Sequence, residues 1–291
     1  MTALPAPPTL ASPSWWGADS VRHREHDGSQ SVFVKQMTPF SRAYVHVPSS
    51  FAAAVAAGER GYGPNVISAE AASGRLVLED LTGTHKTGTL ADFIDRDDIA
   101  RLAAIRREVS TLDPVVVRRA VVFDEIRDVL EHAVAHNAAL PGDLPWLLRV
   151  VADIEQRIEA AGFDLAFCHG DGNVSNTMIA RDSGAVALLD WDACGLMDPM
   201  QDLGGILAEL APFDLEGRDL FEAYWGSFDA SLHARARLYG AIDSIRWALI
   251  GAYADAVAPG TYEYSKFSDW HFFLARTRLA PGRIDELLRM V

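Results

Sequence analysis

The sequence has few cysteines, no long apolar run and a shortage of basic residues, and each shortage argues against a class of protein. Its two cysteines, Cys168 and Cys194, form no Cys-x-x-Cys pair, which argues against a structural zinc site. We expect both to be reduced, packed thiols of a cytoplasmic protein. No apolar run is long enough to span a bilayer, and the N-terminus lacks the basic region and apolar core of a secretory signal peptide. We therefore expect neither export nor a membrane partner.

The shortage of basic residues bears on the partners of the chain. Its 291 residues include 26 basic and 40 acidic ones, which gives a formal net charge of -14. Nucleic acid is not expected as a partner, because phosphate contacts need clustered Lys and Arg. An acidic cleft would attract a cationic substrate, although an acidic, solvated surface explains the charge equally well. With 49% hydrophobic residues, the chain can form one large domain or two lobes, as a monomer or a homodimer.

The most informative stretch runs from residue 167 to residue 192. Two short apolar runs flank an Arg-Asp-Ser-Gly turn at residues 181–184 and predict a β-hairpin. Asp171 and Asn176 come before the hairpin, and Asp190 follows it. Phosphoryl transfer needs a carboxylate for the attacking hydroxyl and oxygen ligands for Mg²⁺. We predict that Asp171 is the base and that Asn176 and Asp190 bind the metal; the alternative is a buried hairpin with a capping Asp.

This order and spacing resemble a known family. His169-Gly-Asp171, Asn176 five residues on, Asp190 and the later string Asp198-Pro-Met-Gln-Asp202-Leu-Gly resemble the aminoglycoside phosphotransferase and choline kinase superfamily. These are small-molecule kinases with a protein-kinase-like fold. The resemblance also implies that His169 supports the catalytic loop structurally and does no acid–base chemistry. Asp202 begins an apolar helix, and we expect it to support the site by bonding the backbone of the catalytic loop.

The resemblance covers about residues 30–280 and implies a fold class. We expect an α+β, two-lobed protein-kinase-like fold, with a small β-rich N-lobe and a larger, mostly helical C-lobe. Residues 1–80 would form the N-terminal nucleotide-binding lobe. Residues 81–291 would form the C-terminal catalytic and substrate-binding lobe.

The nucleotide site follows from the same resemblance. Lys35 lies in an alternating strand pattern and corresponds to the lysine that contacts the α- and β-phosphates. The segment Glu79, Asp80 and Leu81 resembles the hinge strand, whose backbone would meet the adenine. The implied cofactors are ATP, with GTP as the alternative donor, and Mg²⁺. Read without the family, Lys35 is simply an exposed charge on a strand.

Other side chains are candidates for the acceptor substrate, a small molecule with a hydroxyl group. Asp192 could bind a second Mg²⁺ or the substrate, or could cap a turn. Trp225, Trp247 and Trp270 could hold an amine by cation–π attraction, although aromatics at helical spacing also form cores. Weaker candidates for binding an ammonium group are the acidic residues Asp243, Asp255, Glu263 and Asp269.

Two departures from the family pattern leave a second function open. In the family, a flexible loop with glycine or small polar residues closes over the phosphates of the nucleotide. The corresponding segment here, residues 14–20, has one glycine, so we expect this loop to cover the phosphates less well. The segment at residues 47–54 contains no acid and Glu59 comes late, so Lys35 should lack its pairing carboxylate.

The first function is ATP-dependent phosphorylation of a small, cationic hydroxyl compound such as an amino alcohol or aminoglycoside. The alternative is an inactive pseudokinase that binds nucleotide or a partner.

Periodicity and stop signals predict the remaining elements. A Pro-rich, extended N-terminus is expected at residues 1–14. Strands are predicted at 21–26, 31–37 and 75–81. Helices are predicted at 51–57, 98–112, 123–139, 144–161, 202–210, 220–228, 234–255 and 267–279.

Overall fold

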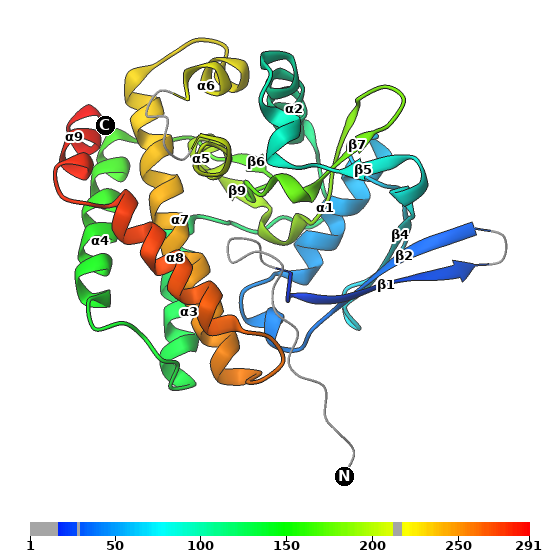
Figure 1. Cartoon of the computed structure of the whole chain (residues 1–291), viewed down its shortest axis with the longest axis horizontal. Coiled ribbons are helices and arrows are strands. Elements are labelled where there is room, and N and C mark those ends of the chain that lie inside the picture. Colours follow the sequence, from blue (N-terminus) through cyan, green and yellow to red (C-terminus); the bar gives the residue numbers. More distant parts are fainter. Residues whose placement is uncertain (1–16, 28–29, 212–216) are drawn as a thin grey trace.

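The computed structural model describes residues 17–27, 30–211 and 217–291. Within these residues a β-sheet lies at one end and a larger, mostly helical part at the other (Figure 1). This is the predicted α+β, two-lobed arrangement. The predicted extended segment at residues 1–14 lies outside the described residues, and of the glycine-poor segment only residues 17–20 are described. The division into domains at residue 80 stays a prediction.

The sheet of the N-terminal part has four antiparallel strands. They are β1 (Ser20–Asp27), β2 (Gln30–Met37), β3 (Val66–Glu70) and β4 (Arg75–Glu79), in the spatial order β1-β2-β4-β3. Val34 pairs with Val77 on one face. Lys35 pairs with Leu76 on the opposite face. Because successive side chains of a strand alternate between faces, the lysine is directed away from the Val34 cluster. Sequence periodicity missed β3, none of whose residues is buried.

Helix α1 (Val47–Glu59) follows the lysine strand and contacts the loop that carries Asp192. It begins four residues before the predicted helix and ends two residues after it. His46 caps its start by accepting a hydrogen bond from the amide of Ser49, at 3.3 Å. Small residues on its buried face, including Ala53 and Ala57, let the helix pack closely on its neighbours.

The linker and the central strands bring together residues that are far apart in sequence. β5 (His85–Thr87) pairs with β7 (Thr177–Ala180), and β7 forms a hairpin with β8 (Val186–Leu188). The hairpin predicted around the Asp-Ser-Gly turn is confirmed. β6 (Ala166–Cys168) pairs instead with β9 (Gly195–Met197). The loop after β6 is therefore held beside the segment that follows the hairpin.

The helical part is built around α7, which is buried along most of its length. Helices α3, α5 and α8 all pack against α7, so α7 forms the centre of the helical core. The helices of this part are α2 (Arg96–Glu108), α3 (Val122–Ala135), α4 (Leu144–Ala161), α5 (Pro199–Leu210), α6 (Arg218–Trp225), α7 (Ala230–Val257), α8 (Tyr264–Arg278) and α9 (Arg283–Met290). Helix α4 has its predicted ends, and α9 was not predicted.

Glycines allow two close approaches that position the site. A Cβ on Gly204 of α5 would lie 2.3 Å from the carbonyl oxygen of Ala236 in α7, and a Cβ on Gly172 would lie 2.1 Å from the carbonyl carbon of Gly205. Any side chain would push these backbones apart. Helix α5 is thus fixed against α7, and the loop containing Gly172 is fixed against α5.

The segment between β2 and α1 also contacts the helical part directly, in addition to the covalent linker. The ring of Phe40 lies edge-on to Tyr264 with centroids 6.0 Å apart, and Tyr44 lies edge-on to Tyr253 at 6.4 Å. Edge-to-face pairs of this kind add to the burial of apolar surface. The two parts of the molecule are therefore packed together beside the cleft described below.

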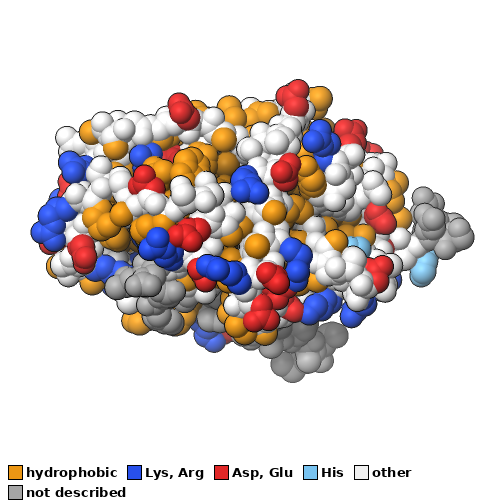
Figure 2. Space-filling view, turned by 90° about the horizontal axis from the view of Figure 1, so that it is seen from above, with side chains coloured by type: hydrophobic (Ala, Val, Ile, Leu, Met, Phe, Trp, Pro, Cys, Tyr) orange, Lys and Arg blue, Asp and Glu red, His pale blue; other side chains and the backbone are white. Residues whose placement is uncertain are grey.

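The surface of the described molecule carries both signs of charge. Figure 2 shows acidic and basic side chains interspersed over one face. Among the residues that the structure describes, no helix combines the length and the apolar character that crossing a membrane requires.

Candidate active site

Asp171 lies in the loop at residues 169–176, which we call the catalytic loop. Its carboxyl accepts one hydrogen bond from the backbone amide of Asn173, at 2.8 Å, and one from the side-chain Nδ2 of Asn176, at 2.7 Å. Burial raises the pKa of Asp171 to about 7, and Asp190 adds to this while the Asn173 amide opposes it. A carboxyl that titrates near neutral pH is suited to accept a proton from a hydroxyl.

His169, two residues earlier, is a buried neutral side chain. Its Nε2 lies 2.8 Å from the carbonyl oxygen of Leu189; because a carbonyl can only accept, Nε2 carries the proton. Burial, aided by the Arg106 guanidinium, lowers the pKa of His169 to about 3. The ring packs on Trp191 with centroids 4.7 Å apart. His169 therefore ties the catalytic loop to the end of the hairpin, and its predicted supporting role stays a proposal.

Asp202, near the start of α5, contacts the backbone of the catalytic loop. Its Oδ1 accepts a hydrogen bond from the amide of Gly170 at 2.8 Å, and its Oδ2 accepts one from the hydroxyl of Tyr224 at 3.3 Å. Its side chain is 1% exposed. A buried carboxylate with two donors holds the loop in place, which is the position that the sequence predicts for it.

Asp190 and Asp192 meet Lys35 across the cleft. Lys35 Nζ donates to Asp190 Oδ1 and to Asp192 Oδ2, each at 2.7 Å. Although burial alone would lower the pKa of Lys35, the two carboxylates raise it above its usual value. The lysine is therefore charged and held between two acids that follow the hairpin.

This arrangement corrects the expectation that Lys35 lacks a pairing carboxylate. The acid does not come from residues 47–54 but from Asp192, 157 residues away in sequence. At the place in α1 where the acid was expected, the hydroxyl of Ser50 donates to Asp192 Oδ1 at 2.6 Å. Helix α1 thus contacts the lysine through the carboxylate of Asp192.

The backbone at Asp190 is strained. It has φ 61° and ψ 74°, in the left-handed region that a residue with a side chain rarely adopts. The hairpin fixes this conformation, since the amide of Leu189 donates to the carbonyl of Asn176 at 2.8 Å. Strain of this kind is often stored at functional sites. Asn176 and Asp190 are therefore brought next to each other at the end of the hairpin.

The donor set fits Mg²⁺ held together with phosphate oxygens. Asn176 uses its Nδ2 on Asp171, so its amide oxygen is the group available to a cation, and Asp190 supplies a carboxylate. Mg²⁺ commonly takes one or two such protein oxygens plus phosphates and waters. Among the described residues, no group of three or more His, Cys, Asp or Glu could hold a metal alone. A Mg²⁺ ion held by Asn176 and Asp190 would take its remaining ligands from phosphates and water.

The predicted hinge residues have local partners. Glu79 accepts a hydrogen bond from Asn65 Nδ2 at 2.8 Å, and Asp80 accepts one from Arg24 Nε at 2.7 Å. Bonds from Thr82 and other neighbours hold the pKa of Asp80 well below its usual range. The Asp80 carboxylate thus shapes the start of the linker through Thr82, whereas Glu79 binds the residue before β3. Contact of these residues with a nucleotide stays a prediction.

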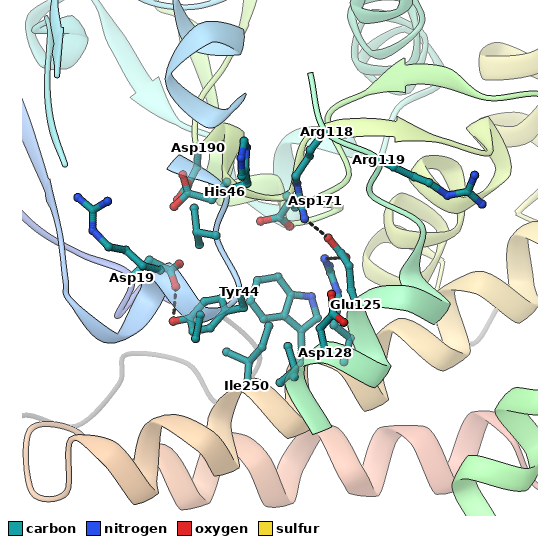
Figure 3. Close-up of a pocket in the computed structure, with 18 residues that line it drawn as sticks. Asp19, Tyr44, His46, Arg118, Arg119, Glu125, Asp128, Asp171, Asp190 and Ile250 are labelled. Atoms are coloured by element: carbon teal, nitrogen blue, oxygen red, sulfur yellow. Dashed lines mark hydrogen bonds and ion pairs between the residues drawn. The ribbon is translucent and has the colours of Figure 1, made fainter. Parts of the chain in front are cut away.

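A hollow of about 330 Å³ lies between the segments that flank β1 and β2 and the helical part (Figure 3). Asp171, Asp190 and Asp192 all line it. Asp19 faces it as well and accepts a hydrogen bond from Tyr44 at 2.7 Å. Burial, together with Asp192 and Asp190, raises the pKa of Asp19 to about 7. The predicted base and two of the predicted acidic ligands thus share one cleft.

A buried chain of charges forms another part of the wall. Glu125 lies 2.6 Å from Arg118 and 2.7 Å from Arg246, and Arg246 lies 2.7 Å from Asp243. These ion pairs tie α3 to α7 below the cleft. Asp243 is thus already paired with an arginine.

A second, smaller hollow of about 70 Å³ lies on the other side of Asp171, against α5, α7 and α8. Trp247 lines both hollows and donates from Nε1 to Asp243 at 3.1 Å. The structure does not bring the other two predicted tryptophans to these hollows. Trp225 is 45% exposed at the end of α6, and Trp270 is 38% exposed and stacks on Phe273. A helical spacing could not show which tryptophans face Asp171.

Sequence reasoning missed several charged residues of the site. Arg106 donates from Nη2 to the carbonyl of Asp171, and its Nη1 lies 3.7 Å from Asp202 Oδ1. A signal was present, since Arg106 falls on the same face of α2 as the buried Leu102 and Val109. An arginine in an apolar stripe should find a buried partner. No comparable signal marks Arg118 or Asp19.

Comparisons with known proteins give related results. Residues 12–240 match the model of a family described as the phosphotransferase enzyme family. A sequence search of curated proteins finds no match. Among solved structures, a choline/ethanolamine kinase family protein from Mesorhizobium loti is similar with a TM-score of 0.76 and 22% identity, over 96% of this chain and 95% of that one.

Two further solved structures show the same fold. Choline kinase LicA from Streptococcus pneumoniae has a TM-score of 0.72 and 15% identity, over 88% of this chain and 89% of that one. A spectinomycin phosphotransferase, in complex with ADP and spectinomycin, has a TM-score of 0.59 and 12% identity, over 94% of this chain and 91% of that one.

Proposed function

The chain belongs to the phosphotransferase enzyme family, and we propose that it transfers the γ-phosphate of ATP, with Mg²⁺, to a hydroxyl group of a small molecule. The observation that carries this proposal is the shared cleft of Asp171 and Asp190, with Asn176 bonded to one and Lys35 to the other. This is the set of groups that phosphoryl transfer needs. A structural neighbour that holds ADP supports a nucleotide as the donor; GTP is the alternative donor.

In this proposal each residue has one task. Lys35, freed from Asp190, contacts the α- and β-phosphates, while its ion pair with Asp192 holds the ammonium group in place. Asn176 and Asp190 would hold the Mg²⁺, which neutralises charge on the phosphates. Asp171 orients the acceptor hydroxyl and takes its proton. The backbone of the segment that begins at Glu79 would contact the base of the nucleotide.

The acceptor we propose is a hydroxylated amine, such as an amino alcohol or an aminoglycoside-like compound. The smaller hollow supports this choice, because it places the rings of Trp247 and Phe267 near the carboxylates of Glu209 and Asp243, beside Asp171. Aromatic faces attract ammonium groups by about 0.5–2 kcal/mol. Two structural neighbours named as choline or choline/ethanolamine kinases agree with a small amine. The oligomeric state stays a prediction.

The pseudokinase alternative has lost its main support. It depended on an unpaired Lys35, and Lys35 is paired with both Asp190 and Asp192.

We also retain a cytoplasmic location as a proposal, since Cys168 and Cys194 are free and buried, as is usual in a reducing compartment.

Thermal unfolding with ATP or GTP, each with and without Mg²⁺, tests the nucleotide site. A nucleotide at a hundred times its dissociation constant should stabilise the fold by about 2.7 kcal/mol. In the wild type we expect this shift only when Mg²⁺ is present. In Asp190→Ala, adding Mg²⁺ should give no further stabilisation. This variant should also have no turnover, while its fold stays intact. If neither nucleotide shifts the transition at millimolar concentration, the proposed donor site is wrong.

A further inference from the structure

Arg106 of α2 lies directly behind the catalytic loop and takes no part in the scheme above. It is 4% exposed. Its Nη2 donates to the backbone carbonyl of Asp171, and its Nη1 lies 3.7 Å from Oδ1 of Asp202. The same Asp202 oxygen accepts the amide of Gly170. One guanidinium therefore contacts the residue proposed as the base and the carboxylate that anchors the preceding residue.

Stability alone does not explain an arginine at this position. Its Nε and Nη1 are buried and make no hydrogen bond within the described structure, and a buried donor without an acceptor costs free energy. The surrounding face of α2 is apolar, with Leu102, Ala103, Ile105 and Val109 buried. Replacing Arg106 and Asp202 together by apolar side chains of similar size would often be neutral or stabilising, so packing of this face does not by itself need the ion pair. The guanidinium is thus a feature that packing does not require.

The loop that Arg106 contacts has no regular secondary structure over most of its length. The catalytic loop has no helix or strand between Cys168 and Val174, and a few specific bonds hold its backbone. The carbonyl of Asp171 receives its bond from Arg106, while the amide of Gly170 donates to Asp202. Because the side chain of Asp171 extends from this backbone, a shift of the carbonyl would move the carboxyl that faces the cleft.

We infer that Arg106 is a positioning residue for phosphoryl transfer: it fixes the main chain of Asp171 and the carboxylate of Asp202, so that the Asp171 carboxyl is directed into the cleft. This inference rests on the proposed function of Asp171. Arg106 is absent from the lining of the 330 Å³ hollow and instead lines a cavity of about 10 Å³ beside Asp171 and Asn176. It should therefore affect turnover more than nucleotide affinity.

The test compares three variants in steady-state kinetics: Arg106→Met, Arg106→Lys and, as the control, Arg107→Met. Arg107 is the next residue of the same helix, and its side chain is exposed. A misplacement of about 1 Å can cost about a hundredfold in rate, so we expect kcat of R106M to fall about a hundredfold. Its KM for nucleotide should stay within about threefold of the wild type, because the groups that would bind the phosphates are intact. R106K should recover part of the lost kcat, and R107M should match the wild type.

Amide hydrogen exchange, measured without substrates, gives a second readout. In the wild type the amides of Gly170, Asn173 and Asn176 are hydrogen-bonded. They should exchange faster in R106M while α7 keeps its protection. This readout separates two failures: if the wild type shows no phosphotransfer, the proposed function fails, whereas unchanged loop exchange in R106M refutes the positioning role.

The kinetic outcomes also decide the question. A wild-type kcat in R106M overturns the inference, and so does a fall in kcat accompanied by faster exchange throughout α7, which would show a general loss of structure. If R106M does not fold, R106K decides alone. A reduced kcat at unchanged KM supports positioning, and a wild-type kcat in R106K contradicts it.

Discussion

The ion pair between Lys35 and Asp192 offers a quantitative check on how the cleft is built. The two charged atoms lie 2.7 Å apart, with side-chain exposures of 8% and 10%. A hydrogen bond to a charged group contributes about 1.5–3 kcal/mol. We therefore predict a coupling free energy of about 2 kcal/mol between Lys35→Met and Asp192→Asn in a double-mutant cycle. The single change K35M should cost more than D192N, because it leaves two neighbouring buried carboxylates without a cation.

Urea unfolding of the wild type, the two single variants and the double variant measures this coupling. The pair Arg218 and Glu222 is a matched control, since it has the same 2.7 Å separation but side-chain exposures of 57% and 32%. An exposed pair four residues apart on a helix is worth only about 0.3–0.5 kcal/mol, and salt screens it. A coupling for Lys35 and Asp192 no larger than that of the control would refute the reasoning that Asp192 replaces the missing acid of α1.

Three further predictions follow from the geometry. Burial alone would raise the pKa of Glu125, but its two arginine partners lower it below its usual value. The stability that this ionised carboxylate contributes is therefore present above the unfolded pKa of about 4.3 and is lost as the pH falls through the folded pKa. In urea unfolding, Glu125→Gln should be about 3 kcal/mol less stable than the wild type at pH 7, and this difference should narrow below pH 4. Trp247→Ala should raise the KM of a hydroxylated amine about two- to thirtyfold, whereas Trp270→Ala should not; equal effects would contradict the placement of the acceptor. Gly172→Ala would bring a Cβ to 2.1 Å from Gly205, while a Cβ at Gly142 meets nothing within 4 Å, so calorimetry should show a loss of about 1–3 kcal/mol or more for the first and almost none for Gly142→Ala.

The parts of this protein that depend on local pattern could be predicted from the sequence. The strand of Lys35 shows alternation, α4 ends at Gly162, and the hairpin follows a clear turn signal. The spacing of Asp171, Asn176 and Asp190 indicated a common site because a hairpin brings its two ends together. Strand β3 and helix α9 were missed, since β3 has no buried alternation and α9 is short.

What could not be predicted depends on contacts between distant segments. Asp192 pairs with a lysine 157 residues earlier, and Arg106 reaches a backbone oxygen 65 residues later. Nothing in the local sequence of either residue indicates its partner. The same holds for the tryptophans, because only packing places Trp247 beside Asp171 and leaves Trp270 on the surface.

The most direct test of the central claim is phosphorus NMR of ATP, Mg²⁺ and a panel of hydroxylated amines with the wild type and with Asp171→Asn. The account predicts a new phosphate monoester signal and an equal amount of ADP with at least one acceptor in the wild type. The Asn variant removes the proton-accepting carboxylate but keeps the size of the side chain, so it should form the ester at least about a hundredfold more slowly. Ester formation at an unchanged rate by Asp171→Asn would contradict the assigned role of Asp171. The absence of ester with every acceptor, despite Mg²⁺-dependent nucleotide binding, would contradict transfer to a small amine.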